Sequence, residues 1–193
     1  MTDARLTNAD DGELARRVAQ GDRAAAAELV DRYQTMVRRF LRRLTGREHL
    51  ADDLAQETFV RVLRSADRFD PRYAMKTWLL TIARRLYLNH IRKNGRMTPV
   101  DDFEREVSRY RDPARQVADD DSRAVLRRHL DDAIATLTEP QRAAIVLFHQ
   151  QELSVEQAAE VMAMPTGTVK SHLHRARAAL RKQLSQTLEV TVP

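Results

Sequence analysis

Hydrophobic residues recur every three or four positions along most of the chain, the spacing that gives an α-helix one apolar side. In the first half this pattern predicts helices over residues 11–20, 22–44, 49–64 and 75–96. In the second half it predicts helices over residues 122–137, 139–151, 154–162 and 166–184. Abundant Ala, Leu, Arg and Glu, with only five glycines, also favour helix over sheet. We therefore expect an all-α protein.

Residues 154–184 hold the most informative pattern. A short apolar stripe ends at Ala163-Met164-Pro165, because proline cannot continue a helix. A second stripe follows at Val169, Leu173, Ala176, Leu180 and Leu184. Two amphipathic helices joined by a short break are typical of a helix-turn-helix. No acidic residue lies between Glu160 and Glu189, so the second helix presents only positive charge, as a helix in the DNA major groove requires. A solvated basic helix is the simpler alternative.

Two stretches interrupt the helical pattern. Residues 65–74 contain the turn signal Asp70-Pro71 and predict a loop. Residues 95–121 show no sustained period and carry eight acidic residues against five arginines, which is typical of an extended linker. The expected division is a disordered N-terminal tail (1–10), a helical domain (11–95), a flexible linker (96–121), a small helix-turn-helix domain (122–186) and a C-terminal tail (187–193).

The predicted helix over residues 49–64 has an acidic side. Opposite its apolar stripe it projects Asp53, Gln56, Glu57 and Val60, with Asp52 at the margin. The simplest interpretation is a solvated acidic face. Because the whole chain is basic, with a net charge of +5, the same face is also a candidate docking site for a basic partner.

Positive charge and aromatic rings are interleaved in the next segment. No acidic residue occurs between Asp70 and Asp101, and four of the chain's ten aromatic residues lie within 69–87. This combination suits single-stranded DNA, whose phosphates attract cations and whose bases stack on rings. Phe69 and Tyr73, in the predicted loop, are the better stacking candidates. Trp78 lies on an apolar stripe and is more simply interpreted as a core residue.

Several kinds of function are disfavoured by composition. The chain contains no cysteine, which excludes a disulfide framework and thiolate metal sites. Its six histidines show no metal-ligand spacing, so we predict no metal, no cofactor and no catalytic residue. The N-terminal residues lack an apolar signal core and no apolar run approaches membrane-spanning length, so a cytoplasmic protein is expected.

Four segments together resemble the extracytoplasmic-function sigma factors of the sigma-70 family. They are ADDLAQETFVRVL (51–63), KTWLLTIARRLYLNHIRK (76–93), LTEPQRAAIVLFHQQELSVEQAAEVM (137–162) and PTGTVKSHLHRARAAL (165–180). The resemblance covers roughly residues 13–96 and 126–184. It implies an initiation factor, not an enzyme, that binds core RNA polymerase through the β′ clamp and the β flap. Such a factor directs polymerase to promoters by recognising minus-thirty-five and minus-ten elements and opening the DNA. An anti-sigma factor is a further implied partner.

The resemblance also implies roles for individual residues. Residues in the position that contacts core polymerase are Asp52, Asp53, Gln56 and Glu57. Residues implied to contact the minus-ten element are Phe69, Tyr73, Lys76, Trp78, Arg84, Arg85, Asn89 and Arg92, with the loop placed to capture a flipped base. Residues implied to contact the minus-thirty-five element are Thr168, Lys170, Ser171, His174 and Arg175, with Arg177 and Arg181 on phosphates.

Three positions depart from the family pattern. Arg85 stands where Asn is common, so minus-ten specificity is expected to differ. His172 stands where Arg is usual, which predicts a weaker phosphate contact. Ala163 occupies a turn position where Gly is common, which predicts slight backbone strain.

Two other functions fit parts of the pattern. The segment TVKSHLHRARAAL also resembles response-regulator DNA-binding domains, but residues 11–95 show no βαβ pattern for a receiver domain. A sigma mimic that only binds an anti-sigma factor should have lost the cationic recognition face, and that face is intact. Promoter-specific transcription initiation remains the preferred function.

Overall fold

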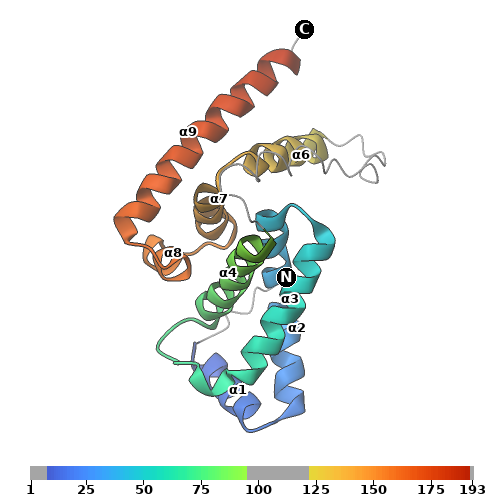
Figure 1. The fold of residues 1–193 in the computed structure, drawn as a ribbon, viewed down its shortest axis with the longest axis vertical. Coiled ribbons are helices and arrows are strands. Elements are labelled where there is room, and N and C mark those ends of the chain that lie inside the picture. The colour runs from blue at the N-terminus through green and yellow to red at the C-terminus, as the bar shows by residue number, and fades with distance from the viewer. Residues whose placement is uncertain (1–7, 95–121, 192–193) are drawn as a thin grey trace.

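The computed structural model describes residues 8–94 and 122–191, and every regular element in these two stretches is helical (Figure 1), which confirms the all-α prediction. The first stretch forms α1 (Asn8–Ala19), α2 (Arg23–Thr45), α3 (Glu48–Arg64), the 3₁₀ turn η1 (Ala66–Arg68) and α4 (Met75–Asn94). The second forms α6 (Ser122–Ala135), α7 (Glu139–Ile145), the π-helical turn η3 (Val146–Gln150), α8 (Val155–Met162) and α9 (Thr166–Thr191). The predicted linker and both chain ends lie outside the described residues.

The N-terminal domain is built around α2. The Asp22 carboxylate accepts hydrogen bonds from the N–H groups of Ala24 and Ala25, at 2.9 and 3.1 Å, and so caps the helix start. Gly46 ends the helix in the left-handed conformation, with φ of 64°. The buried stripe of α2 comprises Ala25, Leu29, Tyr33, Val37, Phe40, Leu41 and Leu44. Helices α1, α3 and α4 pack against it, so one apolar core holds the domain together.

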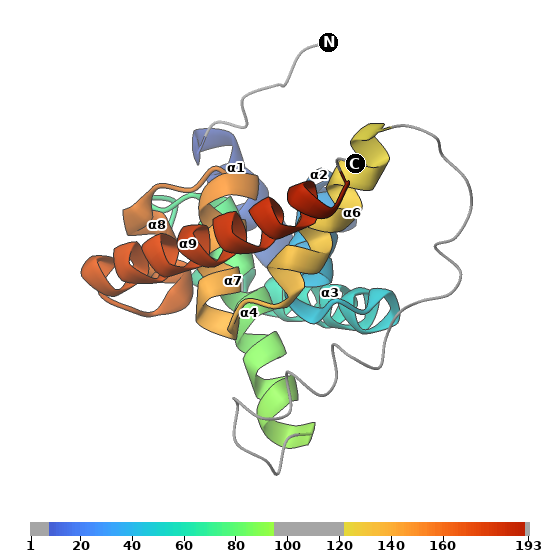
Figure 2. The same cartoon turned by 90° about the horizontal axis from the view of Figure 1, so that it is seen from above.

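Two capping boxes start helices of the C-terminal domain. Thr138 with Gln141 begins α7, and Ser154 with Gln157 begins α8. Helix α8 ends at Ala163, whose φ of 52° lies in the left-handed region that favours glycine. Helix α9 then starts beyond Pro165, and Figure 2 shows it lying across α7 and beside α6. The predicted helix-turn-helix is therefore present.

Three helix boundaries differ from the sequence-based expectation. Helix α1 already begins at Asn8, inside the expected tail. Helix α9 continues to Thr191, because residues 185–191 contain neither proline nor glycine to end it. The helix expected over residues 139–151 changes at Val146 into the π-helical turn η3, which apolar periodicity does not distinguish from α-helix.

The two domains pack directly against each other, with α4 beside α8 and α2 beside α6 and α7 (Figure 1). In this interface Arg142, a residue only 1% exposed, donates a hydrogen bond of 2.9 Å from its guanidinium to the Leu44 carbonyl near the end of α2. The Tyr87 hydroxyl donates to the same carbonyl, also at 2.9 Å. Burial lowers the pKa of Arg142 to about 10, which still leaves it charged at neutral pH. An ion pair between Arg43 of α2 and Asp131 of α6 also crosses the interface.

Candidate nucleic-acid interface

The exposed side of α9 is cationic, as predicted from its periodicity. Val169, Leu173 and Ala176 are buried against the rest of the C-terminal domain. This burial turns outward the predicted reading residues Thr168, Lys170, Ser171, His174 and Arg175, all of which are exposed. The Ser171 hydroxyl donates to the Gly167 carbonyl at 2.9 Å, so its oxygen remains available to accept a hydrogen bond.

Beside the reading face, Arg177 is held in place by two neighbours from η3. Its guanidinium lies 5.3 Å from the centre of the Phe148 ring, within cation–π range. Its Nε donates to Nε2 of His149 at 3.2 Å, so this imidazole accepts in its neutral form. Burial, and secondarily the positive charge of Arg177, lower the pKa of His149. Neutral His149 therefore orients Arg177 without repelling it.

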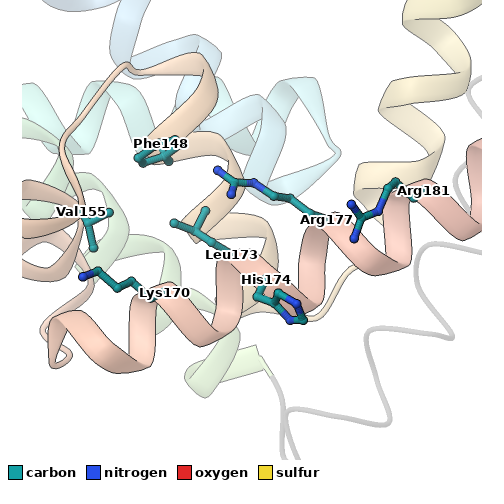
Figure 3. A pocket seen from close by; sticks show the side chains of 7 residues that line it. All are labelled: Phe148, Val155, Lys170, Leu173, His174, Arg177 and Arg181. Carbon is teal, nitrogen blue, oxygen red and sulfur yellow. The ribbon is translucent and has the colours of Figure 1, made fainter.

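These side chains surround a shallow pocket of about 380 Å³ (Figure 3). Its lining residues are Phe148, Val155, Lys170, Leu173, His174, Arg177 and Arg181. Figure 3 shows the three basic residues Lys170, Arg177 and Arg181, together with His174, along one length of α9. An apolar floor with a cationic rim suits a phosphate group.

The acidic side of α3 is also exposed where the sequence places it. Asp53, Gln56 and Glu57 are exposed, and Val60 is an unusually exposed apolar residue at 41%. Asp52 differs, because both its carboxylate oxygens accept hydrogen bonds from Arg38 of α2, at 2.7 and 2.9 Å. The patch thus combines acidic and amide groups with one exposed apolar residue. Glu57 accepts a hydrogen bond of 2.7 Å from Arg61, and the Arg38–Asp52 pair lies at the other end of the patch.

The loop between α3 and α4 presents one aromatic ring. Tyr73 is 50% exposed, whereas Phe69 is only 9% exposed. The Phe69 ring turns inward onto Trp78, with ring centres 5.3 Å apart, because this position lets it bury its apolar surface. The expectation that both loop aromatics are free to stack therefore needs correction for Phe69. Trp78 is partly buried against the core, in line with its apolar stripe.

The basic residues of α4 separate into two groups. Arg85 and Arg92 are exposed and Asn89 is partly buried. Arg84 is only 5% exposed, and it pairs with Glu139 of α7 at 3.2 and 3.0 Å and with the Met162 carbonyl at 3.1 Å. Lys76 donates to the Gln151 carbonyl. In this structure Arg84 and Lys76 therefore face the C-terminal domain and not solvent, unlike the expectation from sequence.

The comparisons with known proteins agree on one family. Residues 29–97 match the model of Sigma-70 region 2, and residues 127–180 match the model of Sigma-70, region 4. The ECF RNA polymerase sigma factor SigW of Bacillus subtilis is 35% identical over 175 residues, covering 88% of this chain and 94% of the relative. The chain belongs to the ECF RNA polymerase sigma factors. The ECF sigma-E factor of Haemophilus influenzae is 34% identical over 180 residues, covering 90% of this chain and 95% of that factor.

Solved structures of sigma factors share the fold. CnrH, in complex with the cytosolic domain of CnrY, superposes with a TM-score of 0.65 at 26% identity, covering 94% of this chain and 99% of that one. The sigma factor RpoE in complex with the anti-sigma factor NepR, from Bartonella quintana, gives a TM-score of 0.64 at 26% identity, covering 82% and 96%.

Family membership confirms the main functional prediction: this sigma factor is a promoter-recognising transcription initiation factor. One matched region falls in each helical half, although the predicted domain limits themselves stay predictions. Within residues 8–94 and 122–191, no helix is long and apolar enough to cross a membrane. In the same stretches no group of three or more His, Asp or Glu could hold a metal ion.

Sequence reasoning missed the residues that join the domains. Glu139 and Arg142 resemble ordinary polar residues at a helix start, and nothing in their local pattern indicates partners on α2 and α4. The positioning of Arg177 by Phe148 and His149 was missed for the same reason, since these residues lie 28 or more positions apart.

Proposed function

We propose that this sigma factor binds core polymerase through α3 and reads the two promoter elements with separate surfaces on α9 and α4. The observation that carries the proposal is the charge of these surfaces. The exposed side of α3 is acidic and that of α9 is cationic, and each of them is open to solvent over most of its residues. The chemistry of RNA synthesis would be supplied by polymerase, so we assign no catalytic role to this chain.

For the minus-thirty-five element, Lys170, Ser171, His174 and Arg175 are the proposed readers of base edges in the major groove. An Arg that contacts guanine through two hydrogen bonds contributes about 1–3 kcal/mol of discrimination. Arg177 and Arg181 are the proposed phosphate contacts. The support for Arg177 is its fixed orientation, because a preorganised side chain loses less entropy on binding.

For core polymerase, the proposed contact is the acidic patch of Asp53, Gln56 and Glu57, with exposed Val60 one turn further along α3. Acidic side chains would steer the patch toward a basic surface of the β′ clamp, and Val60 would supply apolar contact. Asp52 would act mainly by holding α3 against α2 through Arg38. A contact with the β flap is proposed for the C-terminal domain on resemblance alone.

For the minus-ten element, Tyr73 is the proposed ring that stacks on an unpaired base, and Arg85, Asn89 and Arg92 face the DNA. Arg84 and Lys76 can join them only after the C-terminal domain moves away from α4, because their donors are occupied by Glu139, Met162 and Gln151. We therefore propose that the two domains separate when the factor engages polymerase and promoter.

An anti-sigma factor is a further proposed partner. Two similar sigma-factor structures that cover most of this chain are complexes, one with CnrY and one with the anti-sigma factor NepR. By analogy, a regulator that keeps the domains together would prevent use of the minus-ten surface.

Run-off transcription with purified core polymerase on a library of genomic fragments tests the proposed function. We expect promoter-specific transcripts that depend on this protein. If it binds core polymerase yet supports no transcript from any fragment, a sigma mimic is favoured. If it binds specific DNA without polymerase, a helix-turn-helix regulator is favoured.

A further inference from the structure

Helix α1 lies directly against the loop that carries Tyr73, and the contact is unusually close at one point. A Cβ atom added to Gly12 would lie 3.0 Å from Cβ and 3.9 Å from Cγ of Pro71. Glycine weakens a helix relative to alanine, so its presence inside α1 needs a reason. The close approach of the Pro71 ring supplies that reason. Figure 1 shows α1 beside the segment that joins α3 to α4.

Helix α1 is itself rigidly attached to the domain. The Asp11 side chain, in a residue only 3% exposed, accepts a hydrogen bond of 2.7 Å from the Tyr33 hydroxyl and one of 3.2 Å from Arg32. Both partners come from α2. One turn later Leu14, Ala15 and Val18 are buried in the core. These bonds and buried contacts hold the surface that Gly12 presents to Pro71 in a fixed position.

The loop is fixed on its other sides as well. Phe69 is anchored on Trp78, and Asp70 accepts hydrogen bonds of 3.0 Å from the N–H of Arg72 and, through its carbonyl, from the N–H of Tyr73. The Arg72 guanidinium, which also pairs with Asp70, holds the pKa of that carboxyl below its usual range. Pro71 has a restricted φ of its own. Tyr73 therefore leaves a rigid turn whose position depends on where Pro71 rests.

We propose that Gly12 is a positioning residue for minus-ten recognition: α1 seats Pro71 and thereby sets the direction in which Tyr73 meets an unpaired base. Gly12 touches no DNA in this mechanism. Its absent side chain allows the loop to sit close to α1, and an added methyl group pushes the loop outward. The inference rests on the minus-ten role proposed above for this loop.

The first test compares Gly12→Ala with the wild type in complex with core polymerase, on a promoter that the wild type uses. Opening is followed with a 2-aminopurine base in the minus-ten element, and polymerase affinity is measured separately. We expect opening to slow roughly tenfold, since small misplacements of a reacting group have effects of this order or larger. Polymerase affinity should change less than twofold. Glu13→Ala, the neighbouring exposed position on α1, is the matched control and should open DNA like the wild type.

A second comparison separates positioning from a general loss of structure. Pro71→Gly removes the ring that Gly12 touches, so Gly12→Ala should have little further effect in that background. This comparison remains valid even if Gly12→Ala alone lowers thermal stability. Unchanged opening in Gly12→Ala, an equal loss of polymerase affinity, or additive effects with Pro71→Gly would each overturn the inference. Absence of any transcript with the wild type would instead refute the proposed function.

Discussion

The contact between Arg84 and Glu139 predicts how readily the two domains part. Substituting Glu139 with Gln keeps the shape of the side chain but removes the charge that faces Arg84. The side chains of Arg84 and Glu139 are only 6% and 16% exposed, so solvent screens this pair weakly. Two hydrogen bonds join them, at 3.2 and 3.0 Å.

The expected magnitude follows from the loss of one charged partner. A hydrogen bond to a charged group contributes about 1.5–3 kcal/mol, and leaving a buried charge without its partner costs as much or more. When the domains are separated, water solvates Arg84, so the substitution destabilises only the state in which the two domains are packed together. We therefore expect Glu139→Gln to shift the equilibrium toward separated domains by about 10- to 100-fold. The Arg142, Lys76 and Arg43 contacts remain, so the shift is toward opening and not to complete separation.

Fluorescence energy transfer measures this equilibrium directly. The natural chain has no cysteine, so two introduced at the exposed positions Ala27 and Ala178 can be labelled specifically, one in each domain. Glu139→Gln should increase the low-transfer population, and it should strengthen binding of free protein to a single-stranded minus-ten oligonucleotide. Glu156→Gln, an exposed change of the same kind on α8, is the control. Identical transfer distributions for Glu139→Gln and the wild type would refute the role given to this ion pair.

Three further predictions concern the acidic patch of α3, the cationic face of α9 and the turn at Ala163. Reversing Asp53 and Glu57 to Lys should abolish core-polymerase binding in a pull-down without changing the circular dichroism spectrum. Reversing Glu13 and Asp31 to Lys is the control and should leave binding unchanged. If the Asp53 and Glu57 double variant still binds polymerase, α3 is not the contact. Arg175→Ala should cost about 1–3 kcal/mol of promoter affinity, with a loss that depends on the base it contacts, while Arg181→Ala should weaken binding to all sequences similarly. If both variants lose the same affinity on every sequence tested, these separate roles are wrong. Ala163→Gly should raise the unfolding free energy by about 1 kcal/mol by relieving a left-handed alanine, and a thermal melt without any gain contradicts this.

Local sequence signals predicted the helices and their outward faces well. The caps at Asp22, Gly46 and Ser154 act through neighbours within four residues, so they are visible in the sequence. The reading face of α9 follows from apolar periodicity, because buried Val169, Leu173 and Ala176 leave only the other sides exposed. For the same reason the acidic side of α3 was predicted, including exposed Val60.

Contacts between distant segments were not predictable in this way. Arg84 and Arg142 have the side chains of surface residues, yet both are buried because each lies where its own domain meets the other. Phe69 lies in a loop, where no periodicity indicates that it turns inward onto Trp78. Similarly, nothing in the sequence indicates that Asp52 pairs with Arg38 of α2 or that Lys76 donates to the Gln151 carbonyl. A single sequence carries no signal for pairs separated by such distances along the chain.

The Leu44 carbonyl, which accepts hydrogen bonds from both Tyr87 and Arg142, has a consequence for reversibility. When the domains part, Tyr87 stays with its own domain and still satisfies this carbonyl. Arg142 likewise keeps its bonds to the carbonyls of Ala135, at 3.0 Å, and Leu137, at 2.8 Å, within the C-terminal domain. The Leu44 carbonyl and the Arg142 guanidinium therefore each keep a partner within their own domain, so parting at this contact leaves neither group unsatisfied. Separation and reassociation at this contact can therefore be reversible.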